Sequence, residues 1–298
     1  MPLLFHFPGY DSIAYRLKEH LGGCALGEVT VRHFPDGESF VQIHTDVKGK
    51  DVILFCGLEQ PDTKAMALLF FTKVAKELGA KSVGLVAPYL GYMRQDKRFH
   101  DGEAVTSKLF AAFLSHHIDW LVTVDPHLHR HKTLEEIYTI PSRVLHAADT
   151  LSAWIKQSVA KPLIIGPDEE SEQWVVDVAQ KASAPFIILI KERYGDRNVE
   201  VSVPEIAAYK DHTPILVDDI ISTARTMIET VTHLKKAGTK PPICIGVHGV
   251  FAKGAYDSLL NSGVERVVTC NTIVHSSNAI DIAPLLATGI RELACCAG

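Results

Sequence analysis

The chain has 298 residues, of which 47% are hydrophobic and 22% are charged, and its formal net charge is -5. This length and balance are typical of a soluble globular protein with room for two ordinary domains, and the negative charge argues against binding nucleic acid through a basic surface. No apolar run is long enough to span a bilayer, no secretory signal opens the chain and the six cysteines form no CxxC pair, so we expect a cytoplasmic protein with free thiols and no membrane partner.

Short β-branched runs alternate along the chain with amphipathic segments. The segment 33–47 alternates apolar and polar residues and carries turn residues, which predicts an antiparallel excursion. Strands are predicted at 51–56, 82–88, 120–125, 162–168, 186–191, 214–219, 243–248 and 266–271. Helices are predicted at 62–78, 104–116, 171–182, 225–237 and 254–262. In the second of these helices Val105, Leu109, Ala112 and Phe113 share one apolar face.

Many of the predicted strands are apolar on both faces, which is typical of a parallel sheet covered by helices on each side. The strand–helix series restarts near residue 145. The sequence therefore predicts an α/β protein of two similar domains, 1–145 and 146–298, each with a mainly parallel sheet flanked by helices.

Titratable and phosphate-seeking side chains collect at the ends of these strands, where open α/β sheets bind their ligands. Ordinary loops would carry Ser, Asn and Gly at such places instead. The residues concerned are Arg94, Gln95, Asp96, Asp125, His127, Asp168, Lys191 and the segment 218–226.

The stretch LVDDIISTART (216–226) ends a buried strand on two carboxylates and continues into a hydroxyl-rich turn. If Ala224 starts a helix, Ser222 or Thr223 is its N-cap, and the free N–H groups of the first turn can bind an anion. Asp218 and Asp219 would repel a phosphate, but they suit the vicinal hydroxyls of a sugar or a metal bound by those hydroxyls. The stretch predicts a ribose 5-phosphate site formed by Asp218, Asp219, Ser222, Thr223, Ala224, Arg225 and Thr226.

LVDDIIST resembles the phosphoribosyl-pyrophosphate binding motif shared by type I phosphoribosyltransferases and ribose-phosphate pyrophosphokinases. The segments FPDGESFVQI (34–43), APYLGYMRQDKRF (87–99), TVDPH (123–127), GPD (166–168) and IKER (190–193) each resemble a segment of the ribose-phosphate pyrophosphokinase family, in the same order. The resemblance extends from about residue 3 to residue 290. It implies an enzyme with its active site between the two domains, which transfers the pyrophosphoryl group of MgATP to ribose 5-phosphate and releases AMP.

The same resemblance implies roles for single residues. Phe34 would stack on adenine in a hairpin that reaches a neighbouring subunit, which implies a homo-oligomer, at least a dimer. His127 would meet the metal–ATP complex, Asp168 would bind Mg²⁺, and Lys191 and Arg193 would close over the transferring group. The implied ATP contacts are Phe34, Asp36, Glu38, Arg94, Gln95, Asp96, Lys97 and Arg98.

The phosphate turn departs from the common pattern of this family. Ser222 stands where many members have an acid, and Ala224 and Arg225 stand where they have two glycines, which narrows the backbone freedom of the turn. The chain is also shorter than the allosterically controlled members, so their regulation is not expected here.

Three alternative functions remain open from the sequence. A catalytically silent regulatory homologue would keep the fold, although it should lose Lys191, His127 or the paired acids. A simple phosphoribosyltransferase would lack the 34–43 and 87–99 segments. The H-x-H pattern in VDPHLHRH also occurs in metal-dependent hydrolases built on βα barrels.

Overall fold

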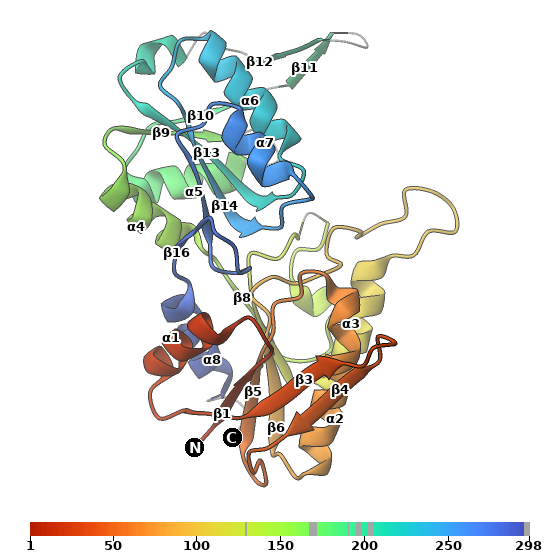
Figure 1. The fold of residues 1–298 in the computed structure, drawn as a ribbon. Helices are drawn as coiled ribbons and strands as arrows, with labels where there is room; N and C mark the ends of the chain where they lie inside the picture. The colour runs from red at the N-terminus through yellow and green to blue at the C-terminus, as the bar shows by residue number, and fades with distance from the viewer. Residues whose placement is uncertain (129, 167–171, 190, 195–197, 202–205, 295–298) are drawn as a thin grey trace. The chain divides into compact units, whose positions relative to one another are not determined.

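The computed structural model describes residues 1–128, 130–166, 172–189, 191–194, 198–201 and 206–294 (Figure 1). The chain forms two units, which are described separately. The first unit contains residues 1–146, 272–274 and the stretch from Ile282, and the second contains residues 147–271 and 275–281. The sequence placed a single boundary near residue 145, whereas the C-terminal helix belongs to the first unit.

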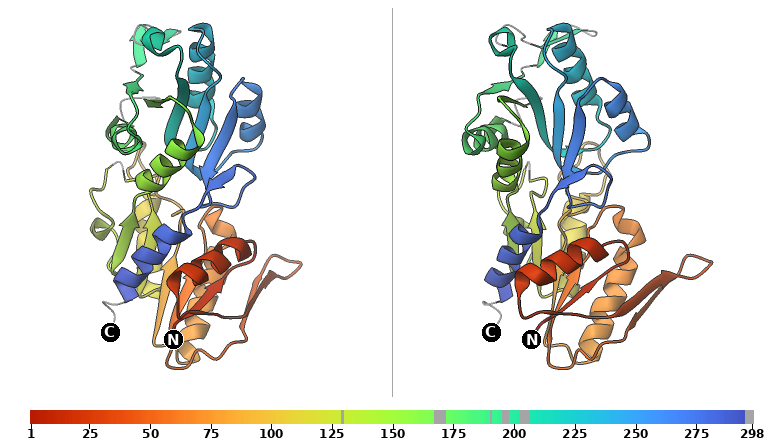
Figure 2. Two further views of the ribbon diagram at one scale, coloured as in Figure 1. Left: turned by 90° about the vertical axis from the view of Figure 1, so that its left-hand side faces the viewer. Right: turned by 60° about the vertical axis from the view of Figure 1, so that its left-hand side comes forward.

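The first unit is a six-stranded sheet in the order β2-β1-β5-β6-β7-β8, with all neighbours parallel. A separate antiparallel hairpin, β3–β4, projects from it (Figure 2). Helices α1 and α8 cover one face of the sheet, and α2 and α3 cover the other. The elements are β1 (Leu3–His6), α1 (Asp11–Leu21), β2 (Ala25–Leu26), β3 (Val29–His33), β4 (Ser39–Ile43), β5 (Asp51–Phe55), α2 (Ala65–Glu77), β6 (Ser82–Val86), α3 (Thr106–His117), β7 (Trp120–Val124), β8 (Ser142–Leu145) and α8 (Ala283–Ala294).

The second unit repeats this plan. Its parallel sheet has the order β10-β9-β13-β14-β15-β16 and its hairpin is β11–β12. Helices α4 and α5 lie on one face, and α6 and α7 on the other. The elements are α4 (Ala148–Ser158), β9 (Pro162–Gly166), α5 (Glu172–Ala182), β10 (Phe186–Ile188), β11 (Lys191–Tyr194), β12 (Asn198–Val201), β13 (Thr213–Ile221), α6 (Arg225–Lys236), β14 (Ile243–Gly249), α7 (Ala255–Asn261), β15 (Arg266–Cys270) and β16 (Asn278–Ile280).

The two strand orders become identical when β1 is matched to β9, β2 to β10 and so on to β8 and β16. The predicted fold class, two similar α/β domains with mainly parallel sheets, is therefore confirmed. Central strands are buried along their whole length, as in β7 and β14, because helices cover both faces of each sheet.

In each unit, one helix directly follows in the chain the last strand of the other unit's sheet. Helix α4 follows β8 in the chain but packs on α5 of the second unit, and α8 follows β16 but packs on α1, β7 and β8 of the first. The side chains of Ile282, Leu286 and Ile290 are buried in and before α8. Near its C-terminal end, α8 is also joined to β8 by an ion pair of 2.6 Å between Glu292 and Arg143.

Two sequence predictions need correction. The predicted strand 186–191 is not one strand, because β10 ends at Ile188 and a separate hairpin strand, β11, begins at Lys191. Helix α3 buries Ser107, Phe110, Ala111 and Leu114, whereas Leu109 of the predicted apolar face is 63% exposed. Ser107 is 1% exposed, so the buried face includes a small hydroxyl side chain and is rotated away from the purely apolar stripe.

Candidate active site

The carboxyl ends of the strands in the first sheet meet along one edge, and neighbouring loops there are joined by polar side chains. Because the strand order is β1-β5-β6-β7-β8, each contact joins two adjacent strand ends. The contacts are Tyr10 with Glu59 and Lys64, Asp62 with Tyr92, Asp96 with Arg130, and Asp125 with His146.

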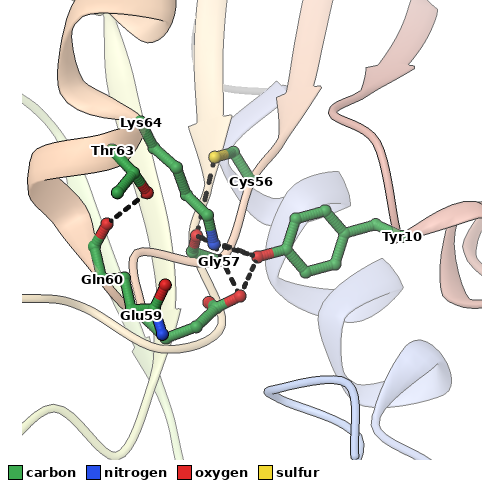
Figure 3. Close-up of polar contacts among 7 residues, drawn as sticks. All are labelled: Tyr10, Cys56, Gly57, Glu59, Gln60, Thr63 and Lys64. Atoms are coloured by element: carbon green, nitrogen blue, oxygen red, sulfur yellow. Dashed lines mark hydrogen bonds and ion pairs between the residues drawn. The ribbon is translucent and has the colours of Figure 1, made fainter. Parts of the chain in front are cut away.

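The contact between the β1 and β5 ends is a compact cluster around the ammonium group of Lys64 (Figure 3). Lys64 Nζ donates to Tyr10 Oη at 2.6 Å, to Glu59 Oε1 at 2.6 Å and to the carbonyl of Gly57 at 2.9 Å. Tyr10 Oη also lies within hydrogen-bond distance of Glu59 and of the Gly57 carbonyl, and its single proton can be donated to either. Burial, followed by the charge of Glu59, raises the pKa of Tyr10 well above its ordinary value. This cluster was not predicted from the sequence, because Tyr10 is 54 residues from Lys64 and the members match no motif.

The loop after β6, residues 87–105, is called the RQDKR loop after its residues 94–98. Arg94, Lys97 and Arg98 are exposed. Arg98 Nε donates to the Glu103 carbonyl at 3.0 Å, and the carboxylate of Glu103 accepts the backbone N–H groups of Phe99 and His100. The loop therefore holds its own turn while presenting three cationic side chains at the surface.

Asp96, predicted as an ATP contact, differs from its neighbours in the loop because its side chain is buried. Its side chain is 2% exposed, and its carboxylate accepts a hydrogen bond of 2.9 Å from Arg130 Nη1. A buried carboxylate needs a partner, and the loop after β7 supplies it. Asp96 thus joins two loops.

Two residues of these loops have left-handed backbones, which non-glycine residues adopt at a cost of about 1–3 kcal/mol each. Tyr92 has φ +63° and Asp125 has φ +33°. Each stands two positions before a predicted site residue, Arg94 and His127 respectively. Each is also anchored, Tyr92 to Asp62 and to the ring of Phe110, and Asp125 to Nδ1 of His146 at 2.8 Å.

The hairpin β3–β4 carries Phe34, Asp36 and Glu38 in its turn. Phe34 is 38% exposed, and the guanidinium of Arg32 lies 4.5 Å from its ring centroid. Asp36 accepts the backbone N–H of Glu38 at 3.2 Å, so its carboxylate shapes the turn. Arg32 was not selected from the sequence, although its cross-strand register with Phe40 places it beside both aromatic rings.

In the second unit, β13 extends to Ile221 and pairs with β14 up to Gly249. Asp218 and Asp219 therefore lie within the strand, which continues two residues beyond its predicted end at residue 219. Both are half-buried. The backbone N–H of Asp219 donates to Asp218 Oδ1 at 2.9 Å.

The turn between β13 and α6 differs from the predicted capping. Helix α6 begins at Arg225, and its N-cap is Ala224, with φ +58° and no side-chain cap bond. Neither Ser222 nor Thr223 is the cap, because the turn needs a left-handed residue directly before the helix. The carbonyl of Ser222 accepts the N–H of Ala252 at 3.0 Å, which fixes the turn to the loop after β14.

Asp168 lies outside the described residues. The backbones of Lys191 and Arg193 lie in β11, opposite Val201 and Val199 of β12. Within the described part of the chain no three His, Cys, Asp or Glu side chains are grouped to hold a metal ion, and no helix there has the length and apolar character needed to cross a membrane.

Comparisons with known proteins agree with this architecture. Residues 3–117 match the family model described as the N-terminal domain of ribose phosphate pyrophosphokinase, and residues 133–283 match the phosphoribosyl transferase domain. A ribose-phosphate pyrophosphokinase of Methanopyrus kandleri is 30% identical, covering 93% of this chain and 94% of the relative. One from Methanothermobacter thermautotrophicus is 31% identical, covering 90% and 92%.

A solved structure is also similar over the full length. The phosphoribosylpyrophosphate synthetase of Mycobacterium smegmatis superposes with a TM-score of 0.84 at 26% identity, covering 98% of this chain and 99% of that one. The alternative of a βα-barrel hydrolase is wrong, since both sheets are open and have the order given above.

Proposed function

The chain belongs to the ribose-phosphate pyrophosphokinase family, and we propose that it transfers the pyrophosphoryl group of MgATP to the anomeric hydroxyl of ribose 5-phosphate. The products are phosphoribosyl pyrophosphate and AMP. The observation that carries the proposal is the pairing of two different strand-end sites in one chain. The first unit presents the cationic RQDKR loop, and the second presents two carboxylates followed by a helix N-terminus.

The RQDKR loop is proposed to bind the phosphates of ATP. Arg94, Lys97 and Arg98 are exposed cations, and Gln95 adds amide donors between them. Such groups stabilise a polyphosphate by charge neutralisation and hydrogen bonding. Asp96 is left out of this contact set because its carboxylate is buried against Arg130.

The β3–β4 turn is proposed to bind adenine. Phe34 offers an exposed aromatic face, and Glu38 and Asp36 offer acceptors for the exocyclic amine. The hairpin projects from the first sheet (Figure 2), which supports the proposal that it serves the ATP site of a second copy in a homo-oligomer, at least a dimer. The guanidinium of Arg32 lies over the Phe34 ring, 4.5 Å from its centroid, and so helps to hold the ring in place.

Ribose 5-phosphate is proposed to bind at the end of β13. The first N–H groups of α6 have no partner inside the helix, and with the helix dipole they favour a phosphate. The hydroxyls of Ser222, Thr223 and Thr226 add donors around it. The carboxylates of Asp219 and Asp218 then accept hydrogen bonds from the sugar hydroxyls. Acceptors thus serve the ribose, and donors serve its phosphate.

In the transfer step the anomeric oxygen of ribose attacks the β-phosphorus of ATP. A new oxygen–phosphorus bond forms as the hydroxyl gives up its proton to solvent, the bond from the β-phosphorus to the α–β bridging oxygen breaks, and AMP leaves with that oxygen. Lys191 and Arg193 are proposed to neutralise the charge that develops on the transferring group, and His127 to orient the β- and γ-phosphates. Phosphoryl transfer depends chiefly on positioning and on charge stabilisation of this kind.

The residues at the site suit an Mg²⁺ ion that is held partly by the phosphates of ATP. The described residues offer no complete metal cage, and Mg²⁺ in such enzymes is commonly held by one or two carboxylates together with substrate phosphates. His127 and Asp168 are proposed to contact the ion that arrives with ATP. When bound, Mg²⁺ neutralises the phosphate charge.

Incubation with ribose 5-phosphate and MgATP tests the proposal, with the nucleotide products separated by chromatography. AMP formation that depends on ribose 5-phosphate is expected. Release of ADP would indicate an ordinary kinase, and absence of any nucleotide product would favour the silent regulatory homologue. A phosphoribosyltransferase would consume, not form, phosphoribosyl pyrophosphate.

A further inference from the structure

The RQDKR loop is attached to its neighbours on both sides. On one side, Tyr92 Oη bonds to Asp62 of the β5–α2 loop. On the other, Asp96 accepts from Arg130 of the loop that follows β7. The four exposed or half-buried residues assigned to ATP lie between or next to these two attachments: Arg94, Gln95, Lys97 and Arg98.

The Asp96–Arg130 pair is asymmetric. The side chain of Asp96 is 2% exposed, and that of Arg130 is 47% exposed. Arg130 can therefore be hydrated when it is alone, whereas Asp96 cannot. Removing the guanidinium leaves a buried charge that must either find water or move outward. Outward movement of Asp96 displaces Gln95 and Lys97, its neighbours in the chain.

The backbone before this pair is also poised to relax. Tyr92 is left-handed at φ +63°, a conformation that persists only where the surroundings over-determine it. With the Arg130 anchor gone, the segment from Tyr92 to Asp96 keeps the Tyr92–Asp62 bond and the bond of 3.3 Å from the Ser107 N–H to the Gln95 carbonyl, but it loses its attachment to the loop that follows β7. Strain at Tyr92 then favours a rearranged loop in which Arg94 and Gln95 no longer have their present positions.

From this geometry we propose that Arg130 is a positioning residue for ATP binding, which acts through Asp96 to hold the RQDKR loop against the loop that follows β7. The inference rests on the proposed function, because it takes ATP to be the ligand of the RQDKR loop. It assigns Arg130 no contact with ATP. The loop after β7 also carries His127, so the same pair fixes the spacing between the two groups of phosphate-binding residues.

The test is steady-state kinetics of AMP formation by Arg130→Met, Arg130→Lys and the unmodified protein. Arg143→Met is the matched control: Arg143 pairs with Glu292 at 2.6 Å and is 51% exposed, but it joins β8 to α8 and lies outside the site. We expect Arg130→Met to raise the KM for ATP about tenfold or more, as small displacements of positioning groups do. The KM for ribose 5-phosphate should stay within about twofold, and Arg130→Lys should recover part of the loss.

Each outcome has one meaning. If the unmodified protein forms no AMP, the proposed function fails. The second case is that the unmodified protein forms AMP, that Arg130→Met lowers thermal stability about as much as Arg143→Met, and that Arg130→Met leaves the KM for ATP unchanged. Arg130 is then structural only, and the inference is wrong. If Arg130→Met does not fold, Arg130→Lys decides, because a retained charge keeps Asp96 paired with poorer geometry: a KM for ATP raised by about threefold supports the inference, and an unchanged one overturns it.

Discussion

Replacing Lys64 by Met should destabilise the first unit much more than removal of an ordinary surface lysine. Lys64 and Glu59 are about one-fifth exposed (20% and 22%), so the ion pair is largely desolvated. Breaking a fully buried pair costs about 3–5 kcal/mol. After discounting for the remaining solvent contact, we expect about 2–3 kcal/mol. Met keeps the length and apolar character of the side chain, so the loss reports on the ammonium and its three hydrogen bonds.

The measurement is urea unfolding followed by the fluorescence of Trp120, which lies in β7 of the first unit. Trp154 and Trp174, the other two tryptophans, are replaced by Phe so that the second unit does not contribute. Lys50→Met is the control, because the Lys50–Asp46 pair is exposed (35% and 77%) and should be worth less than about 1 kcal/mol.

A double-mutant cycle sharpens this test. Glu59→Gln should cost less than Lys64→Met, because Lys64 keeps Tyr10 and the Gly57 carbonyl as acceptors. In the double variant no buried carboxylate remains, so the two effects should fall short of additivity by about 1–2 kcal/mol. Additive effects, or a Lys64→Met loss no larger than that of Lys50→Met, would refute the reasoning that this cluster is a coupled, desolvated unit.

Three further changes test other parts of the structure. Lys191→Ala should lower kcat about 10³-fold with nearly unchanged affinity for ribose 5-phosphate, and single-turnover assays with unchanged rates would remove Lys191 from the mechanism. Asp219→Asn should raise the KM for ribose 5-phosphate about tenfold and leave that for ATP within about twofold; normal Michaelis constants would contradict its role. Burial raises the pKa of the Cys56 thiol from 9.0 to about 12. Above pH 9 the unfolded chain releases this proton and the folded chain does not, so the folded state loses about 1.4 kcal/mol by pH 10. Unfolding of Cys56→Ala at pH 8 and pH 10 should show a correspondingly smaller loss, and an unchanged pH dependence would show that Cys56 does not titrate in this way.

Most strands from β5 onward and the helices α2, α3, α5, α6 and α7 could be predicted from the sequence, because a sheet buried on both faces demands β-branched runs. The elements β1, β8, α1, α4 and α8 were not predicted. Short edge elements such as β2 and β16 could not be predicted, since two or three residues carry no readable periodicity. Helix α8 has a clear apolar stripe, but nothing local indicates that it packs on α1, about 270 residues earlier in the chain. That assignment depends on tertiary contacts alone.

The candidate site shows the same division. Residue type indicates residues 94–98 and 218–226 as candidate contacts for phosphate and sugar, and the family comparisons support the activity proposed for the chain. The burial of Asp96 could not be inferred from the sequence, because a carboxylate between a glutamine and a lysine resembles any other loop acid. Only the arrival of Arg130 from the next strand end explains its burial. Likewise, Ala224 has no side-chain feature that announces a left-handed cap.

The crossed placement of α4 and α8 has a consequence for how the chain is made. Translation delivers residues 1–146 first, yet one face of the first sheet is completed by α8, residues 283–294. Until synthesis is almost finished, the apolar surface on α1, β7 and β8 that α8 covers remains open to solvent or to chaperones. The first half of the chain is therefore not an independent folding module, and a version cut after residue 146 should need α8 supplied in trans or fused to it. The first unit thus depends on the far end of the sequence for one of the helices that cover its sheet.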